Sequence, residues 1–205
     1  DAWNKDMDTL ERLQKLGMKN LRLAFTILPE NVQDFAKVYD ETRRRGIQFT
    51  HAFAQSSEHY FGGIQVDNHP DVKVLREQYS YVMNEELKSW NLKRWARSYF
   101  AYGLYRFSME REQVLSNDPG TRFFYIDARG MVYPSVVHSY GMGNIQNYDS
   151  WEDLWNSERA DNARELVLTK GKPAWMICTA RTAIKKHPLS VGMWVLKNKF
   201  GGVKL

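Results

Sequence analysis

Among the side chains of this sequence, a thiol is the one best suited to ligate a soft metal or to act as a nucleophile. There is one cysteine, Cys178, and His187 follows it nine residues later. An imidazole can activate a thiol, but separation along the sequence does not by itself bring the two groups together. Metal sites need about three or four ligands at suitable spacing, and one cysteine can neither form an internal disulfide nor build a cysteine-only zinc or iron–sulfur site. The histidines show no metal-ligand spacing: His51, His59, His69, His138 and His187. We therefore predict no catalytic residue from these side chains.

A longer pattern surrounds this cysteine. Residues 117–135 begin with Asn-Asp-Pro-Gly and contain two apolar runs on either side of Asp127-Ala128-Arg129-Gly130. Trp151-Glu152-Asp153-Leu154-Trp155 and Cys178-Thr179-Ala180-Arg181 follow further along the chain. This pattern resembles the C-terminal iron–sulfur extension, of the SPASM type, that radical SAM enzymes carry.

The resemblance implies where cluster ligands would stand. In the family the first motif reads Cys-x12-Gly-x4-Cys, and its glycine falls at Gly130. A later group reads Cys-x2-Cys-Trp-x2-Cys-Thr-Ala-Arg. The cysteine positions of both groups are occupied here by Asn117, Ser135, Gly171, Ala174 and Cys178. Because iron–sulfur clusters are held by thiolates, only Cys178 remains as a metal-ligand candidate. We interpret the pattern as a fold that is kept after its auxiliary cluster is lost, and we expect Cys178 to be a small buried residue.

The resemblance also implies a reaction that this chain cannot perform alone. In the family a Cys-x3-Cys-x2-Cys loop binds a [4Fe–4S] cluster, which binds S-adenosylmethionine and generates a radical that modifies a peptide or a small metabolite. This chain has no such loop. It begins Asp1-Ala2-Trp3-Asn4, without a methionine, a basic region or an apolar signal core. We therefore expect a C-terminal portion of a longer, cytoplasmic protein, with the catalytic cluster outside this chain.

Two β/α units are expected to open the fold. Asp8-Thr9-Leu10-Glu11 is typical of a helix start, and Leu21–Ile27 of a strand. A second helix is expected between Asn31 and Gly46, followed by a strand over Ile47–Phe53. Consecutive units of this kind favour a parallel sheet, but two units cannot close a barrel. The predicted fold class is α/β, with partial TIM-like barrel units whose N-terminal half lies elsewhere, then helices and a small SPASM-like β-hairpin and helix domain.

Two polar residues follow or end these strands. In a barrel, Asn31 and His51 would lie toward the active face, near the C-terminal ends of the strands. The alternative for Asn31 is a simple helix cap, which we favour. For His51 the alternative is a polar residue at a loop edge, and the sequence leaves both interpretations open.

Four regions are predicted along the chain. They are a partial barrel (1–65), a helical connector (66–110), a SPASM-like domain (111–187) and a basic C-terminal segment (188–205). Residues 56–70 are expected to form a loop, and Ser150 to cap a helix that starts at Trp151. Aromatic residues at helical spacing between Leu75 and Phe107 alternate with lysines and arginines. That spacing is more typical of a buried helix face than of a surface for single-stranded nucleic acid, so a nucleic-acid partner is not expected.

Charge is distributed unevenly. The net charge is +5, but no acidic residue follows Glu165, so that residues 166–205 carry +8 and the remainder −3. A basic end could meet nucleic acid, an anionic membrane surface or an acidic peptide, although a solvated lysine-rich end is the simpler interpretation. The alternative function is therefore a non-catalytic binding or scaffold module that docks an acidic peptide or another macromolecule. No apolar run approaches the length of a membrane span.

Overall fold

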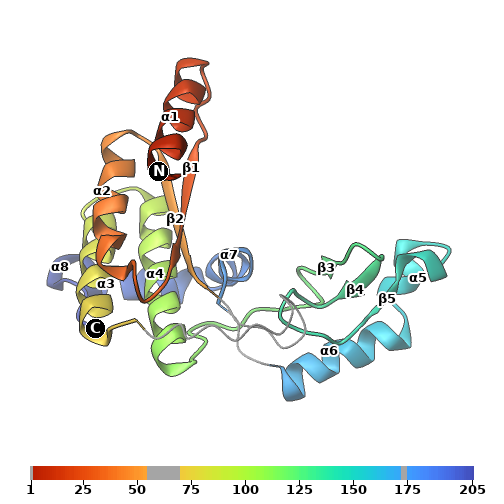
Figure 1. Cartoon of the computed structure of the whole chain (residues 1–205). Coiled ribbons are helices and arrows are strands. Elements are labelled where there is room, and N and C mark those ends of the chain that lie inside the picture. The colour runs from red at the N-terminus through yellow and green to blue at the C-terminus, as the bar shows by residue number, and fades with distance from the viewer. Residues whose placement is uncertain (1, 55–69, 172–174) are drawn as a thin grey trace. The chain divides into compact units, whose positions relative to one another are not determined.

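Figure 1 shows the computed structural model, which describes residues 2–54, 70–171 and 175–205. The expected loop over 56–70 falls almost wholly outside the described residues, as does Ala174. The chain divides into two units, of which the first comprises Asp1–Gln55 and Asp67–Val82, and the second Ser56–Val66 and Met83–Leu205. Among the described residues no helix is both long and apolar enough to cross a membrane.

The first unit contains the two β/α units. Its elements are α1 (Ala2–Lys15), β1 (Arg22–Ile27), the 3-10 helix η1 (Val32–Asp34), α2 (Phe35–Arg44), β2 (Gln48–Phe53) and the start of α3 (Val72–Leu87). β1 and β2 pair in parallel from Arg22↔Gln48 to Ile27↔Phe53, which confirms the predicted parallel pair. The expected start of the first helix was wrong, because Thr9 lies inside α1 and its hydroxyl donates to the carbonyl of Lys5 at 2.7 Å.

The sheet of the first unit has one apolar face and one exposed face. On the apolar face, Phe35 of α2 packs against Phe49 of β2 with ring centroids 5.5 Å apart. On the other face, Ala24 and Thr26 of β1 and Ala52 of β2 are exposed. The described residues therefore form a two-stranded sheet covered on one side and no closed barrel.

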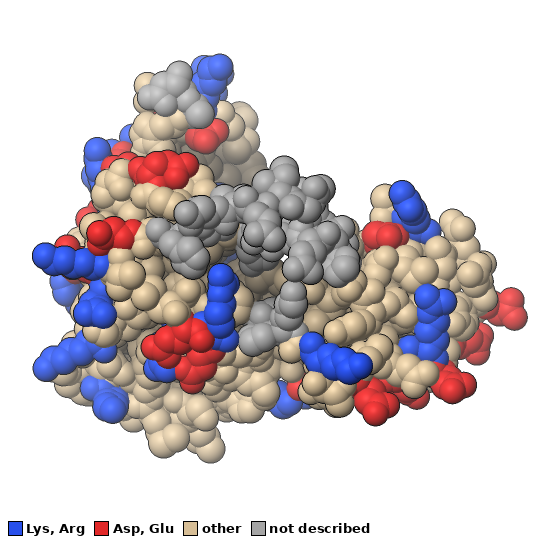
Figure 2. Space-filling model, turned by 60° about the horizontal axis from the view of Figure 1, so that its bottom comes forward, with Lys and Arg blue, Asp and Glu red and all other residues tan. Residues whose placement is uncertain are grey.

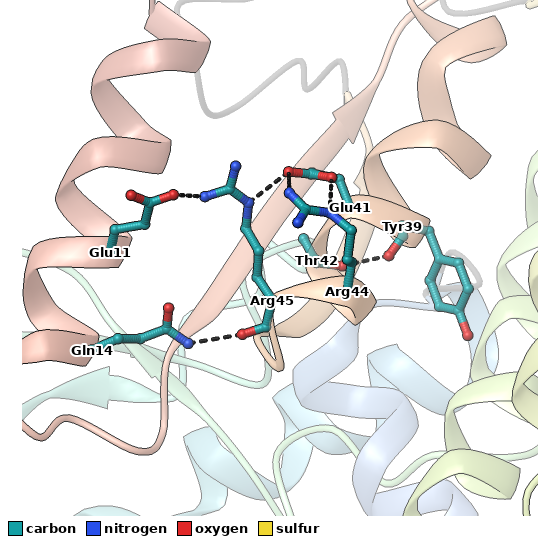
Figure 3. Close-up of polar contacts among 7 residues, drawn as sticks. All are labelled: Glu11, Gln14, Tyr39, Glu41, Thr42, Arg44 and Arg45. Carbon is teal, nitrogen blue, oxygen red and sulfur yellow. Dashed lines mark hydrogen bonds and ion pairs between the residues drawn. The ribbon is translucent and has the colours of Figure 1, made fainter.

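Arg45 ties α1 to the end of α2 (Figure 3). Its Nε lies 2.6 Å from Oε1 of Glu41, and its guanidinium also pairs with Glu11 of α1. Gln14 of α1 donates to the carbonyl of Arg45 at 2.9 Å. Met7 of α1 belongs to a small buried cluster with Leu21 and Ile47, which directly precede the two strands. Arg45, the residue that follows α2, thus holds the first helix in place.

The second unit contains a helical group and a small sheet. Its elements are the end of α3, α4 (Leu92–Glu110), β3 (Tyr125–Ile126), β4 (Met131–Tyr133), β5 (Gly143–Asn144), the 3-10 helix η3 (Ile145–Asn147), α5 (Trp151–Trp155), α6 (Glu158–Lys170), α7 (Ile177–Lys186) and α8 (Pro188–Gly201). Asn91 caps α4, because its side chain accepts from the N–H of Lys93. Helices α4, α7 and α8 contact one another.

Trp175 occupies the core of the helical group. Its side chain is fully buried, and its indole N–H donates to the carbonyl of Phe100 in α4 at 3.0 Å. A Cβ on Gly103 would overlap the indole ring, so this turn of α4 requires glycine at position 103 for the ring to fit. The close approach anchors the start of α7 to the middle of α4.

The small sheet is built around the predicted hairpin. β3, β4 and β5 form an antiparallel sheet in that order. Gly130 has φ +82°, in the left-handed region that glycine adopts without strain, and Oδ1 of Asp127 accepts from the N–H groups of Arg129 and Met131. Ser150 caps α5 as expected, accepting from the N–H of Asp153 at 3.1 Å. The hairpin and the cap are therefore confirmed.

Candidate iron–sulfur site

The position of the second expected cysteine is occupied by a buried, hydrogen-bonded serine. Ser135 follows β4, and its Oγ lies 2.7 Å from Nδ1 of His138, which is also buried. The same Oγ accepts from the N–H of Val137 at 3.2 Å. The ring of His138 stacks on Tyr140, with centroids 6.3 Å apart. Ser135 is thus held in place by hydrogen bonds to neighbouring residues of the same turn.

Gly171 lies next to the same histidine. It ends α6, where its N–H donates to the carbonyl of Val167 at 3.0 Å. A Cβ at position 171 would lie 3.1 Å from Nε2 of His138 and would overlap the carbonyl oxygen of Val167. Positions 135 and 171 are therefore brought together on either side of His138, and this backbone leaves no room for a cysteine at 171.

Asn117 stands in a segment that is fastened to the C-terminal end of α7. On one side of it, Ser116 Oγ is hydrogen-bonded to Nε2 of His187 at 3.2 Å. On the other side, Lys186 donates to Asp118 at 2.8 Å, and this hydrogen bond is the main reason that the pKa of Asp118 lies below its usual value.

The segment that starts at Asn117 also lies beside the end of the hairpin. The N–H of Gly120 donates to the carbonyl of Pro134 at 3.0 Å, and Arg164 of α6 donates to the carbonyl of Gly120 at 2.7 Å. The same guanidinium donates to the carbonyl of Trp155 at 2.7 Å and lies over its ring. Arg164 therefore joins this segment to α5 and α6.

Cys178 lies in the first turn of α7 and is exposed, so the expectation that it is buried was wrong. The reason is the face on which it stands. Thr179, Ala180 and Ala183 are the residues of α7 that are buried, and Cys178 lies outside that face. A helix rises 1.5 Å per residue, so Cys178 and Lys186 are about 12 Å apart along α7. The one thiol and the segment around Asn117 thus lie at opposite ends of the helix.

These residues do not fit an iron–sulfur cluster. Clusters are held by several thiolates or comparable ligands at fixed positions. Here Ser135 is engaged by His138, Gly171 has no room for a side chain, and Cys178 is exposed at one end of α7. Within residues 2–54, 70–171 and 175–205, no group of three or more His, Cys, Asp or Glu side chains could hold a metal ion.

His138 is the residue of this region that sequence reasoning missed. The signal was present in the spacing Ser135-x2-His138, which allows a local side-chain contact across a turn. Its approach to Gly171 had no sequence signal, because α6 separates the two positions along the chain. A surface pocket of about 370 Å³ likewise had no sequence signal, because two segments that are separate along the chain line it. These are the turn before β5 and α6, which contribute Tyr140, Gly141, Glu158, Arg159, Asn162, Ala163 and Leu166.

The two polar residues near the strand ends serve the fold of the first unit. Oδ1 of Asn31 accepts from the N–H of Leu28 at 2.9 Å, and its amide donates to the carbonyl of Thr26 at 3.0 Å. Asn31 therefore shapes the loop after β1, and the side-chain cap that we favoured is absent.

His51 is buried, which answers the question that the sequence left open. Its ring contacts Phe35 edge-on at 4.8 Å and Tyr79 at 5.4 Å, between centroids. Burial lowers the pKa of His51 to about 3, because the charged imidazolium would lose its hydration. His51 is thus a neutral core residue.

One comparison with known proteins bears on this region. Residues 119–180 match the family model of SPASM, described as an iron–sulfur cluster-binding domain. The match covers the hairpin, α5, α6 and the start of α7, and it supports the resemblance over that segment. No curated protein matches the chain, and no solved structure matches it.

Proposed function

We propose that this chain is the C-terminal portion of a cytoplasmic radical SAM/SPASM-like protein that modifies a peptide or a small metabolite. The observation that carries the proposal is the SPASM match over residues 119–180, in which Gly130 forms the hairpin turn and Trp175 fills the core. The catalytic cluster and its S-adenosylmethionine belong to a part of the protein outside this chain.

The first unit supports this assignment. Parallel strands are normally covered on both faces and belong to sheets of several strands. In β1 and β2 one face carries Ala24, Thr26 and Ala52 in exposed positions, so that this face is open to be covered by a further part of the fold. Further strands from the missing N-terminal half would complete the partial TIM-like barrel.

This chain's own contribution is structural. Because Ser135, Gly171 and Cys178 do not fit a cluster, no step of the reaction is assigned to them. The SPASM-like segment supplies a folded unit, and the chain is not catalytically competent by itself.

The coding region upstream of Asp1 tests the proposal. We expect an in-frame Cys-x3-Cys-x2-Cys loop there, and we expect the whole protein, reconstituted with iron and sulfide under anaerobic conditions, to cleave S-adenosylmethionine. A start codon at or just before Asp1 would contradict the assignment. Replacing the three cysteines of that loop by alanine is the control, and it should abolish the cleavage.

A second candidate is a non-catalytic binding or scaffold module that docks an acidic peptide. It is favoured by the position of His138 between residues 135 and 171, the two positions at which the family would place cluster ligands. A site arranged in this way does not require iron. The charges are interspersed on the face that Figure 2 shows, so that the described residues there form no continuous basic surface. Binding of a polyglutamate peptide that survives chelator treatment and weakens with salt would support this candidate.

A further inference from the structure

One face of α8, the helix drawn in dark blue in Figure 1, carries a stripe of large apolar side chains that are exposed. Leu189, Met193, Leu196 and Phe200 are 81%, 66%, 60% and 75% exposed. They are spaced four, three and four residues apart, which places them on one side of a helix. Four such side chains on one helix face are unusual for a surface that only water touches.

The opposite face of α8 is firmly packed. Val191 and Val195 are buried, and the ring of Trp194 contacts those of Tyr99 and Tyr102 in α4 at 5.3 and 5.0 Å between centroids. The helix therefore does not depend on the stripe for its own folding. Its orientation within the second unit is set by the buried face, and this holds the stripe outward.

Lysines border the stripe on both sides. With 3.6 residues per turn, Lys197 falls on one side of it and Lys199 on the other. The ammonium of Lys199 donates to the carbonyls of Leu87 and Ser89 and lies 4.3 Å from the ring centroid of Trp90, which is 72% exposed and extends the apolar surface on that side. Because no acidic residue follows Glu165, this helix carries positive charge only.

We infer that the outer face of α8 binds the surface of a lipid bilayer that contains anionic lipids. An apolar helix face between lysines suits a helix lying in the membrane interface, where the apolar side chains enter the acyl boundary and the lysines meet the headgroups. The inference goes beyond the proposed function and does not depend on it.

The charge pattern favours this occupant over two others. A second copy of the chain would bring lysines of like charge together, with no acidic residue of α8 to pair with them. A soluble acidic peptide would pair with the exposed Lys197 but would leave the four apolar side chains in water. An anionic bilayer can pair with the lysines and also cover the apolar side chains, since it offers negative headgroups above an apolar layer.

Cosedimentation of the full chain with lipid vesicles tests the inference. We expect the chain to bind vesicles of phosphatidylserine, to bind phosphatidylcholine vesicles more weakly, and to dissociate as salt is raised. Phe200→Ser should weaken binding to phosphatidylserine about tenfold, because the phenyl ring would no longer be buried. Lys197→Gln should weaken it about fivefold, and should leave binding to phosphatidylcholine almost unchanged.

Leu168→Ser is the matched control, because Leu168 is 86% exposed but lies on α6. It should not alter binding. Circular dichroism and thermal unfolding of each variant establish that folding is retained, as expected for exposed positions.

Four outcomes would overturn the inference. The first is the absence of binding to phosphatidylserine vesicles at low salt, and the second is an equal effect of Leu168→Ser and Phe200→Ser. The third is a concentration-dependent increase in mass by light scattering that Phe200→Ser abolishes, which would identify the stripe as an interface between copies. The fourth is a polyglutamate peptide that binds as tightly as the vesicles do, with an affinity that Phe200→Ser does not change. That result would show that binding depends on charge alone.

Discussion

Within the SPASM-like segment, the positions that build the fold and the positions expected to hold iron differ in their surroundings. Gly130 adopts the left-handed turn of the hairpin, and Trp175 is fully buried against α4. In contrast, Ser135 is hydrogen-bonded to His138, Gly171 is closed to side chains, and Cys178 points into solvent. The difference teaches that backbone geometry and packing can maintain this fold where thiolate ligands are absent.

The largest effect is expected at Trp175. Trp175→Ala would leave a cavity in the helical group and remove the hydrogen bond to Phe100, so we expect a loss of about 4 kcal/mol in the free energy of unfolding. Urea denaturation followed by circular dichroism measures it. The control is Trp90→Ala, at an exposed position, which should cost about 1 kcal/mol or less. Similar losses for both variants would show that the fold does not rest on Trp175.

His51 extends the contrast to the first unit, where another polar residue is used for packing. Its folded pKa of about 3 lies below the ordinary value of 6.5, so the unfolded chain binds a proton in this range and the native state does not. The stabilising contribution is complete above pH 6.5 and falls by about 1.4 kcal/mol per pH unit as acid is added, or by about 3 kcal/mol near pH 4.

Urea denaturation at a series of pH values tests this expectation. His51→Phe should flatten the stability profile between pH 6.5 and about pH 4 relative to the parent chain. An unchanged slope in the His51 variant would contradict the buried neutral histidine.

Restoring a cysteine at position 171 should be unfavourable. Gly171→Cys would force the new Cβ against the carbonyl of Val167, and we expect a loss of about 2 kcal/mol. Gly192→Cys is the matched control, since no atom lies within 4 Å of a Cβ at that helical position and no destabilisation is expected. Thermal unfolding compares the two variants. Equal stability would mean that position 171 can accept a ligand after all.

Ser135→Ala should have a smaller effect. The substitution removes the hydroxyl that contacts Nδ1 of His138 and the N–H of Val137, so the expected loss is about 1 kcal/mol. Ser190→Ala, on an exposed position of α8, should be neutral. Chemical denaturation resolves the two, and a neutral result at Ser135 would argue that the turn is held by its backbone alone.

The smallest effect is expected at Cys178. Cys178→Ser should change the free energy of unfolding by less than about 0.5 kcal/mol, because the side chain is exposed. In the native parent chain the thiol should react promptly with an aromatic disulfide reagent. Iron and sulfide bound stoichiometrically after anaerobic reconstitution, and lost in Cys178→Ser, would instead show that the site holds a cluster.

Local chemistry allowed several elements to be predicted from the sequence. Gly130 in Asp127-Ala128-Arg129-Gly130 predicted the hairpin, because glycine adopts the required positive φ without strain. Ser150 before an apolar run predicted the cap of α5. The prediction was wrong where one side chain can make two kinds of local hydrogen bond. Thr9 was expected to cap a helix, but its hydroxyl donates to a carbonyl within α1. Asn31 likewise folds onto the loop behind it.

The sequence by itself determined that this chain has one thiol and therefore cannot supply the thiolates of a cluster, since composition does not change on folding. It also determined the spacing that matches the SPASM family over residues 119–180. The contact of His138 with positions 135 and 171, and the exposure of Cys178, depend on the tertiary fold. The physical reason is that these outcomes depend on which faces of α6 and α7 are buried by residues distant along the chain, and periodicity within a single helix does not specify its neighbours.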